Sequence, residues 1–222
     1  MRNAVKIDEL IITSDNSGAI GQKEHDVVQV PDEMTSYFSA RVNFLEQLAN
    51  FSKPTDIILL NFSSDAAWQR YISGIQKFFE EVNLEFPRIS GSTETNIPTL
   101  QSGVGMTMIG KQFRNEKTVE NLHWYSYGMP LVGEQLLAAP EQVADVKKVY
   151  RAFKDGLIEQ VMPVGSKGVL HELESLGVMP QNSFPYDETV SAGPSTVVLL
   201  GVEQNQMEEV EQFFENYLHS IK

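Results

Sequence analysis

The first half of the chain alternates short apolar runs with amphipathic stretches. Short apolar runs bounded by turn residues are typical of strands, and they occupy residues 10–13, 27–30, 57–62 and 103–110. From Asp32 to Phe51 and from Ala66 to Val82, apolar residues recur every three or four positions, which predicts two helices with one buried face each. The order β-β-α-β-α-β predicts an α+β fold in which helices pack on a mixed sheet.

The second half begins after a polar, charged segment at residues 113–121, which predicts a linker. The linker separates an N-terminal domain of residues 1–112 from a C-terminal domain of residues 122–222. Within the second domain we expect further elements in this order: a helix over 141–158, a turn at 163–168, a short helix over 169–176, a strand over 196–202 and a helix over 207–221.

Composition narrows the classes of function. The 222 residues carry a formal charge of −13, which argues against a nucleic-acid partner, so a bound nucleotide is expected to arrive with its metal ion. Cysteine is absent, which excludes disulfides and thiolate metal sites and fits a cytoplasmic setting. No apolar run reaches the roughly 18 residues of a membrane span, and no signal peptide begins the chain. We therefore expect a cytoplasmic protein with no membrane partner.

Two polar segments have the composition of a metal-nucleotide site. In residues 89–96, the small residues Gly91 and Ser92 allow backbone to approach an anion, and Glu94 adds a carboxylate suited to a hard cation. Residues 14–21 form a second acidic segment after the apolar run at 10–13. Both segments are expected to be loops.

Each candidate residue also has an ordinary structural explanation. An aspartate shortly before a glycine, as Asp15 is before Gly18, often caps a turn, and Glu94 or Lys167 alone is most often a solvated charge. The glycines are equally explained by turns. The four histidines show no spacing of metal ligands, and no serine lies in a nucleophile elbow.

Four segments together resemble the aminoimidazole ribonucleotide synthetase (PurM-like) superfamily, which includes thiamine-monophosphate kinase and selenophosphate synthetase. These segments are Ser14–Gly21, Arg41–Glu46, Ser90–Glu94 with its downstream Thr107–Gly110, and Ser191–Thr196. Within the superfamily, the chain is most similar to the α-ribazole kinase-like proteins related to aminoimidazole ribonucleotide synthetase, which are kinases of cobalamin biosynthesis.

The resemblance implies a PurM-like two-domain fold, with an N-terminal ATP-binding domain that forms a barrel in a homodimer and a C-terminal α/β sandwich. It implies ATP and Mg²⁺ as cofactors and a nucleoside-like hydroxyl as phosphoryl acceptor. Carried over to this chain, the magnesium ligands are Asp15, Asn16 and Glu94. The ATP-binding residues are Gly18, Gly91, Ser92, Thr93 and Lys167.

Departures from the family pattern keep a second hypothesis open. Asn16 and Ser92 stand where the family has aspartates, and the chain is shorter than typical members. These differences favour, as the alternative, a catalytically degenerate member that binds a nucleotide or serves a regulatory role.

Overall fold

A computed structural model describes residues 3–114 and 122–221 of the chain. The backbone divides into two compact units, residues 1–115 and 116–222. Most of the predicted linker, residues 115–121, lies outside the described residues. No helix in the described ranges combines the length and the apolar character needed to cross a membrane.

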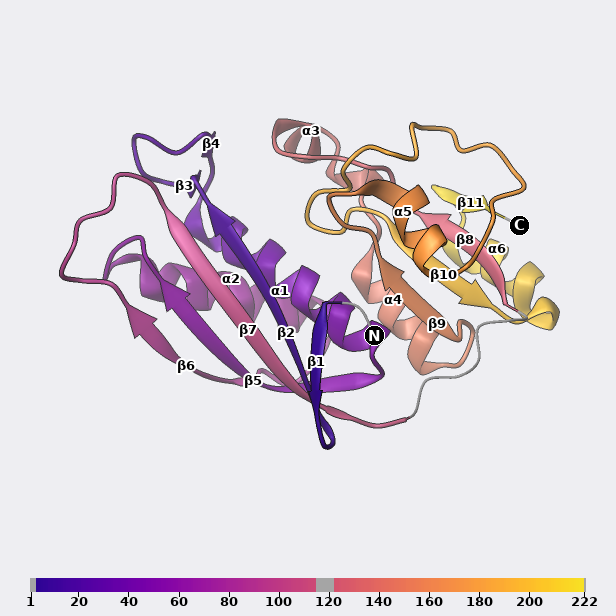
Figure 1. The fold of residues 1–222 in the computed structure, drawn as a ribbon, viewed down its shortest axis with the longest axis horizontal. Helices are drawn as coiled ribbons and strands as arrows, with labels where there is room; N and C mark the ends of the chain where they lie inside the picture. The colour runs from indigo at the N-terminus through magenta and orange to yellow at the C-terminus, as the bar shows by residue number, and fades with distance from the viewer. Residues whose placement is uncertain (1–2, 115–121, 222) are drawn as a thin grey trace. The chain divides into compact units, whose positions relative to one another are not determined.

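Unit 1 is built on a five-stranded sheet with the strand order β1-β2-β7-β5-β6 (Figure 1). Its strands are β1 (Ala4–Ile7), β2 (Leu10–Gly18), β5 (Ser52–Asn61), β6 (Arg88–Thr93) and β7 (Gly103–Gln112). The helices are α1 (Asp32–Ala49) and α2 (Ala67–Glu81), and the short β3 (Ile20–Gly21) and β4 (Val28–Gln29) pair separately. Parallel β5 and β6 are joined through α2, whereas β7 is antiparallel to both β5 and β2.

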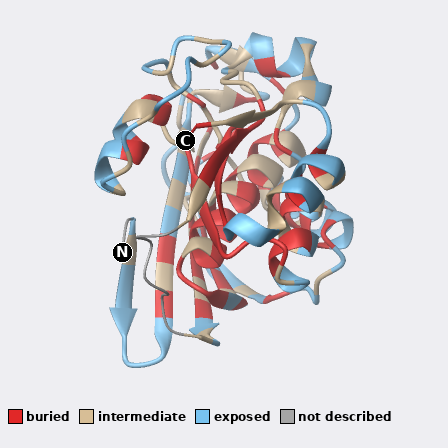
Figure 2. Ribbon diagram, turned by 90° about the vertical axis from the view of Figure 1, so that its right-hand side faces the viewer, coloured by how far each residue is buried: buried red, intermediate tan, exposed pale blue. Residues whose placement is uncertain are grey.

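Both helices lie on the same face of this sheet (Figure 1). They bury the side chains predicted from periodicity, among them Phe44 of α1 and Phe78 of α2, against Ile57 and Met106 of the strands. Figure 2 shows this buried layer in red. The predictions of α1, α2, β5 and β7 are therefore confirmed, with small shifts at most ends, although β5 begins at Ser52, five residues before the predicted start.

Polar side chains also fasten α1 to the sheet. The Gln47 amide, fully buried, donates hydrogen bonds to the backbone oxygens of Ile11 at 3.0 Å and Met108 at 2.9 Å. Gly110 makes room for it, because a Cβ at that position would overlap the Gln47 side-chain oxygen. The buried face of α1 is thus held by specific bonds as well as by apolar packing.

The opposite face of the sheet exposes large apolar side chains. Val5 and Ile7 of β1 are 59% and 53% exposed, Leu10 of β2 is 42% exposed, and Ile58 and Leu60 of β5 are each 40% exposed. Their strand registers place them all on the side away from the helices. We call this surface the open face.

Unit 2 is an antiparallel four-stranded sheet with the order β11-β8-β10-β9. Its strands are β8 (His123–Tyr127), β9 (Gln160–Pro163), β10 (Val198–Val202) and β11 (Leu218–Ser220). Its helices are α3 (Glu134–Ala138), α4 (Val146–Lys154), α5 (Gly168–Ser175) and α6 (Met207–Phe214), with 3₁₀ turns at Pro140–Gln142 and Gln204–Gln206. Trp124 of β8 packs with α5 on one face, and Tyr127 contacts Phe214 of α6 on the other.

Several local expectations are wrong. Residues 14–18 continue β2, and residues 89–93 belong to β6, so neither segment is simply a loop. The helix expected over 141–158 is confined to α4, and the one expected over 207–221 ends at Phe214 and gives way to β11. Residues 14–18 and 89–93 were assigned to loops because their side chains are polar. Strand pairing satisfies the hydrogen bonds of the backbone whether or not the side chains are polar.

Candidate nucleotide site

One edge of the unit 1 sheet gathers part of the predicted site. The carboxyl ends of β2, β5 and β6 meet the start of β7 there, because Gly18 pairs with Gly103 and Asn61 pairs with both Val104 and Thr93. Gly18, Thr93 and Glu94 therefore lie at the same edge of the sheet, although on different strands. Open space surrounds Gly18, where an added Cβ would meet no atom within 4 Å.

Asp15 lies deeper, in the middle of β2 on the face that α1 covers. Its carboxylate accepts a hydrogen bond of 2.7 Å from the hydroxyl of Ser39, which is 1% exposed on α1. Burial raises the pKa of Asp15, and the hydrogen bonds from Ser39 and the Asn16 backbone oppose that rise. The next residue, Asn16, points to the opposite face because neighbouring strand residues alternate.

The predicted magnesium ligands do not converge within one chain. Asp15 of β2 pairs with Met106 of β7, Met106 pairs with Leu59 of β5, and Leu59 pairs with Gly91 of β6. Strand β6 is therefore three strand spacings from β2. At about 4.8 Å per spacing, β2 and β6 lie about 14 Å apart. Magnesium takes its oxygen ligands at about 2.0–2.1 Å, so Asp15 and Glu94 of one chain do not fit a shared ion. Nowhere in the described ranges do three acidic or histidine side chains group as metal ligands.

Glu94 stabilises a turn. Its Oε1 accepts the backbone N–H groups of Asn96 at 2.7 Å and Ile97 at 3.1 Å, and these bonds lower the pKa of the exposed carboxyl group. This is the ordinary structural role that sequence reasoning weighed for Asp15. The carboxylate nevertheless faces solvent and keeps its second oxygen.

The small residues of β6 also serve the sheet. A Cβ at Gly91 would overlap the carbonyl oxygen of Leu59 in β5, so glycine is needed for close strand pairing. Ser92 pairs with Leu60 on the open face, whereas Thr93 lies on the helix-covered side and its hydroxyl accepts a 3.2 Å bond from the Asn61 amide. Ser92 and Thr93 thus point to opposite faces.

Lys167 belongs to unit 2. It is exposed at the N-cap of α5, in a turn closed by the bond from Gly168 N–H to the Gly165 oxygen. Gly168 has φ +81°, and a side chain there would press on the Glu188 carbonyl oxygen at 2.6 Å. The turn predicted at 163–168 therefore exists, and its last glycine is required by backbone geometry.

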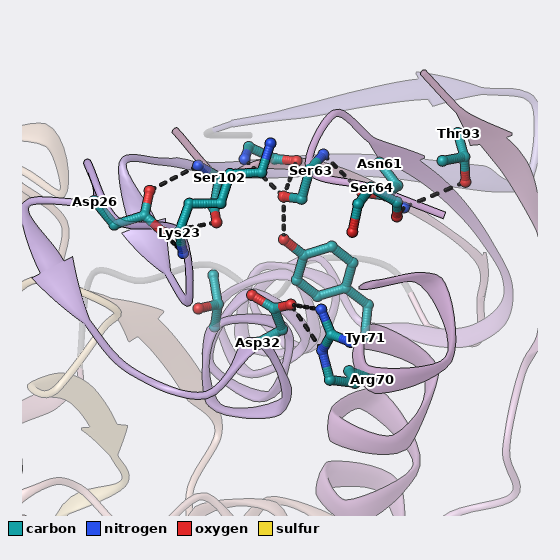
Figure 3. Close-up of polar contacts among 12 residues, drawn as sticks. Lys23, Asp26, Asp32, Asn61, Ser63, Ser64, Arg70, Tyr71, Thr93 and Ser102 are labelled. Atoms are coloured by element: carbon teal, nitrogen blue, oxygen red, sulfur yellow. Dashed lines mark hydrogen bonds and ion pairs between the residues drawn. The ribbon is translucent and has the colours of Figure 1, made fainter. Parts of the chain in front are cut away.

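A polar network at the same sheet edge was missed by sequence reasoning (Figure 3). Asp26 accepts bonds from the Ser102 backbone N–H at 2.6 Å and from its hydroxyl at 2.7 Å. Lys23 reaches Thr99 with bonds of 2.7 and 2.6 Å. Burial favours the protonated acid, but the bonds from Ser102 and Lys23 outweigh it and lower the pKa of Asp26. The network ties residues 22–27 to residues 99–102.

The network extends to the helices. The Ser63 hydroxyl shares a 2.7 Å bond with Tyr71 of α2, and burial raises the pKa of Tyr71 to about 12, so its phenol stays protonated. Arg70 donates two bonds, of 3.0 and 2.8 Å, to one oxygen of Asp32 at the start of α1 (Figure 3). The sequence signal for this network was the run Asn61 to Asp65, polar apart from Phe62, at the end of a buried strand.

Comparison with known proteins gives the fold. No model of a protein family matches the sequence, and no curated protein matches it. Among solved structures, thiamine monophosphate kinase from Aquifex aeolicus superposes with a TM-score of 0.63 at 12% identity, over 100% of this chain and 88% of that one. The hydrogenase maturation protein HypE in complex with ATP gives 0.61 at 9% identity, over 100% and 79%. T. maritima PurL with AMPPCP gives 0.58 at 11% identity, over 99% of this chain and 42% of that one. The chain therefore has a PurM-like fold.

Proposed function

We propose that this protein binds ATP at the sheet edge of unit 1 and transfers its γ-phosphoryl group to a nucleoside-like hydroxyl, as an α-ribazole kinase does. The observation that carries the proposal is the match of the whole chain to PurM-like structures, including HypE with ATP and PurL with AMPPCP. In this proposal residues 1–112 are the ATP-binding and dimerisation domain, and residues 122–222 form the C-terminal domain.

Gly18 is the best-placed contact for the phosphates. It ends β2 in open space, so a phosphate group meets backbone there without side-chain bulk. The Thr93 hydroxyl lies at the same edge and offers a donor. Ser92 is exposed and can contribute a polar contact, whereas Gly91 is already required for strand pairing.

In this proposal, a single carboxylate of the protein binds the magnesium ion. Mg²⁺ is commonly held by one or two carboxylates together with substrate phosphates and water, so Asp15 or Glu94 alone suffices for an ion that ATP brings with it. Phosphoryl transfer needs mainly positioning and neutralisation of charge, which the backbone at Gly18 and such an ion would supply. Asn16, on the opposite face from Asp15, serves at most a separate contact.

A second candidate is a nucleotide-binding or regulatory protein without phosphoryl transfer. One observation favours it: Asp15, Asn16 and Glu94 are spread over two faces and about 14 Å of the sheet. A site in which several carboxylates hold the metal ions of a bound triphosphate is therefore not assembled by a single chain.

We also propose that two copies associate through the open face. Its apolar side chains lie on one side of the strands and lack a helical cover in the described part of unit 1, and contiguous exposed apolar surface marks interaction sites. In 500 mM NaCl, which screens association through surface charges, the expected species by light scattering is a dimer, and Ile58→Asp with Leu60→Asp should return it to the 24.9 kDa monomer. Val27→Asp, at a residue 80% exposed in the loop before β4, is the matched control. A wild-type monomer at 100 µM would contradict the proposal.

Ligand-induced stabilisation tests ATP binding. A ligand at about 100 times its dissociation constant stabilises the folded state by roughly 2.7 kcal/mol. For a chain of this size we expect a rise in melting temperature of roughly 2–4 °C per kcal/mol, larger for ATP with Mg²⁺ than for either alone. No shift at millimolar concentrations would exclude the kinase and leave only a regulatory protein that binds no nucleotide.

Release of ADP separates the two candidates. The kinase predicts ADP release that depends on a nucleoside acceptor and falls in Asp15→Asn. The nucleotide-binding protein predicts the thermal shift without acceptor-dependent ADP release.

A further inference from the structure

The cationic side chains of unit 2 are concentrated on one helix. Residues 122–221 contain five Lys and Arg residues, and four of them lie on α4, whose sequence VKKVYRAFK has no carboxylate. No Lys or Arg occurs from residue 168 to residue 221. A strongly acidic unit therefore presents a single basic helix.

Three of these cations form a stripe along the exposed side of α4. Lys147, Arg151 and Lys154 are spaced i, i+4 and i+7, so they share one side of the helix, and all three are exposed. Arg151 makes a long contact of 3.7 Å with Asp155. Lys147 and Lys154 have no ion pair with any residue that the structure describes.

Helix α6 carries the opposite charge. Its sequence MEEVEQFF has three exposed glutamates, Glu208, Glu209 and Glu211, and no cation, and the C-cap Glu215 is also exposed. The side-chain amide of Gln212, one turn further along α6, lies 3.5 Å from a carboxylate oxygen of Glu208.

The two helices are neighbours. The Arg151 guanidinium lies 5.7 Å from the centroid of the Phe213 ring, and the Gln206 amide donates a 2.9 Å bond to the Gly156 oxygen. No ion pair joins α4 to α6 across the described ranges, so the basic helix and the acidic helix are neighbours that do not neutralise each other.

We propose that two copies of this chain associate through these helices, with α4 of each copy against α6 of the other. A two-fold axis requires a surface complementary to itself. A basic helix beside an acidic helix satisfies that requirement for an axis that runs between them, because rotation by 180° about it places α4 of one copy over α6 of the other. The interface is separate from the open face and does not rest on the proposed enzymatic function.

Salt should control this association. Exposed ion pairs are individually weak, and the Debye length falls from about 8 Å at physiological ionic strength to about 3 Å at 1 M. We therefore expect a pairing that forms at protein concentrations near 100 µM in 20 mM NaCl and weakens at least tenfold in 500 mM NaCl. Association through the apolar open face should persist in high salt.

Sedimentation of the full chain tests the proposal. The mass of the wild-type species should halve when NaCl is raised from 20 to 500 mM, and we call this change the low-salt step. The triple variant Lys147→Glu, Arg151→Glu, Lys154→Glu should abolish it. The reversal of α6, Glu208→Lys with Gln212→Lys and Glu215→Lys, should do the same. An equimolar mixture of the two reversed proteins should restore the association, and Lys77→Glu on α2 is the control that should leave it intact.

Three results would overturn the proposal: a wild-type mass that does not depend on salt, a step that survives either reversal, or loss of the step in Lys77→Glu. Circular dichroism checks that each variant is folded. If a triple variant is not, Lys147→Gln with Lys154→Gln replaces it, and the association constant should fall at least fivefold.

Discussion

Replacing Gly91 with alanine tests whether this glycine serves the sheet or a ligand. The new Cβ would overlap the Leu59 carbonyl oxygen and lie 2.7 Å from the Leu59 carbonyl carbon, so β6 would have to move away from β5. Overpacking of this kind costs about 1–3 kcal/mol. We therefore expect Gly91→Ala to lower the free energy of unfolding by that amount in the absence of any ligand.

Gly105→Ala in the neighbouring β7 is a matched control. Its Cβ would meet only Leu60 side-chain atoms at 3.7 and 3.9 Å, an ordinary contact. Alanine there should stabilise by about 0.4–1 kcal/mol, because it restricts the unfolded chain. The two variants should thus differ by about 1.5–4 kcal/mol, measured by urea unfolding at equal protein concentration.

Equal stability of the two variants, within about 0.5 kcal/mol, would refute the reasoning about close strand approach. The same proteins report on function. If Gly91 serves only the sheet, ATP should shift the melting temperature of a folded Gly91→Ala protein as much as that of wild type. A lost ATP response with unchanged stability would instead assign Gly91 to the phosphates.

Three further substitutions address the remaining site residues. Gly18→Ala should not destabilise the fold, because its Cβ meets open space and alanine restricts the unfolded chain. It should nevertheless weaken ATP binding severalfold by calorimetry if phosphates approach that backbone, and unchanged affinity would remove Gly18 from the site. The pKa of Asp15 is raised by burial, so the unfolded chain releases this proton at lower pH than the folded protein, and folding loses stability as pH rises from the ordinary aspartate pKa through the raised value. Asp15→Asn should lack that loss, and identical urea-unfolding profiles of both proteins from pH 3.5 to 7 would contradict the assignment. Glu94→Gln retains an oxygen that accepts the N–H groups of Asn96 and Ile97, so the unliganded melting temperature should not change. A smaller shift with ATP and Mg²⁺, but not with ATP alone, would identify Glu94 as a magnesium ligand.

The sequence by itself determined the helices and the central strands of unit 1. In α1 and α2 the apolar residues repeat with the helical period, and in β5 and β7 an apolar run lies between turn residues, so local pattern and final structure agree. The division into a first half with this pattern and a second half beyond a charged segment was also visible in the residues.

Tertiary structure decided the extent of β2 and β6. Their ends, Ser14 to Gly18 and Ser90 to Thr93, are polar and were expected to be loops, but each pairs with a strand remote in the sequence. Ser14 pairs with Thr107, 93 residues away, and Ser90 pairs with Ile58, 32 residues away. Pairing over such separations leaves no local pattern, because a strand accepts polar side chains wherever a face or an edge of the sheet meets water.

For the candidate site, too, the residue types were visible in the sequence but their arrangement was set by the fold. Residue types alone indicated candidates such as Asp15 and Glu94, but strand order sets them about 14 Å apart and register turns Asn16 to the other face. The bonds from Ser102 to Asp26 span 76 positions. Only the folded sheet brings such groups within hydrogen-bonding distance, since proximity in space is set by strand order and register, which no local spacing of residues encodes.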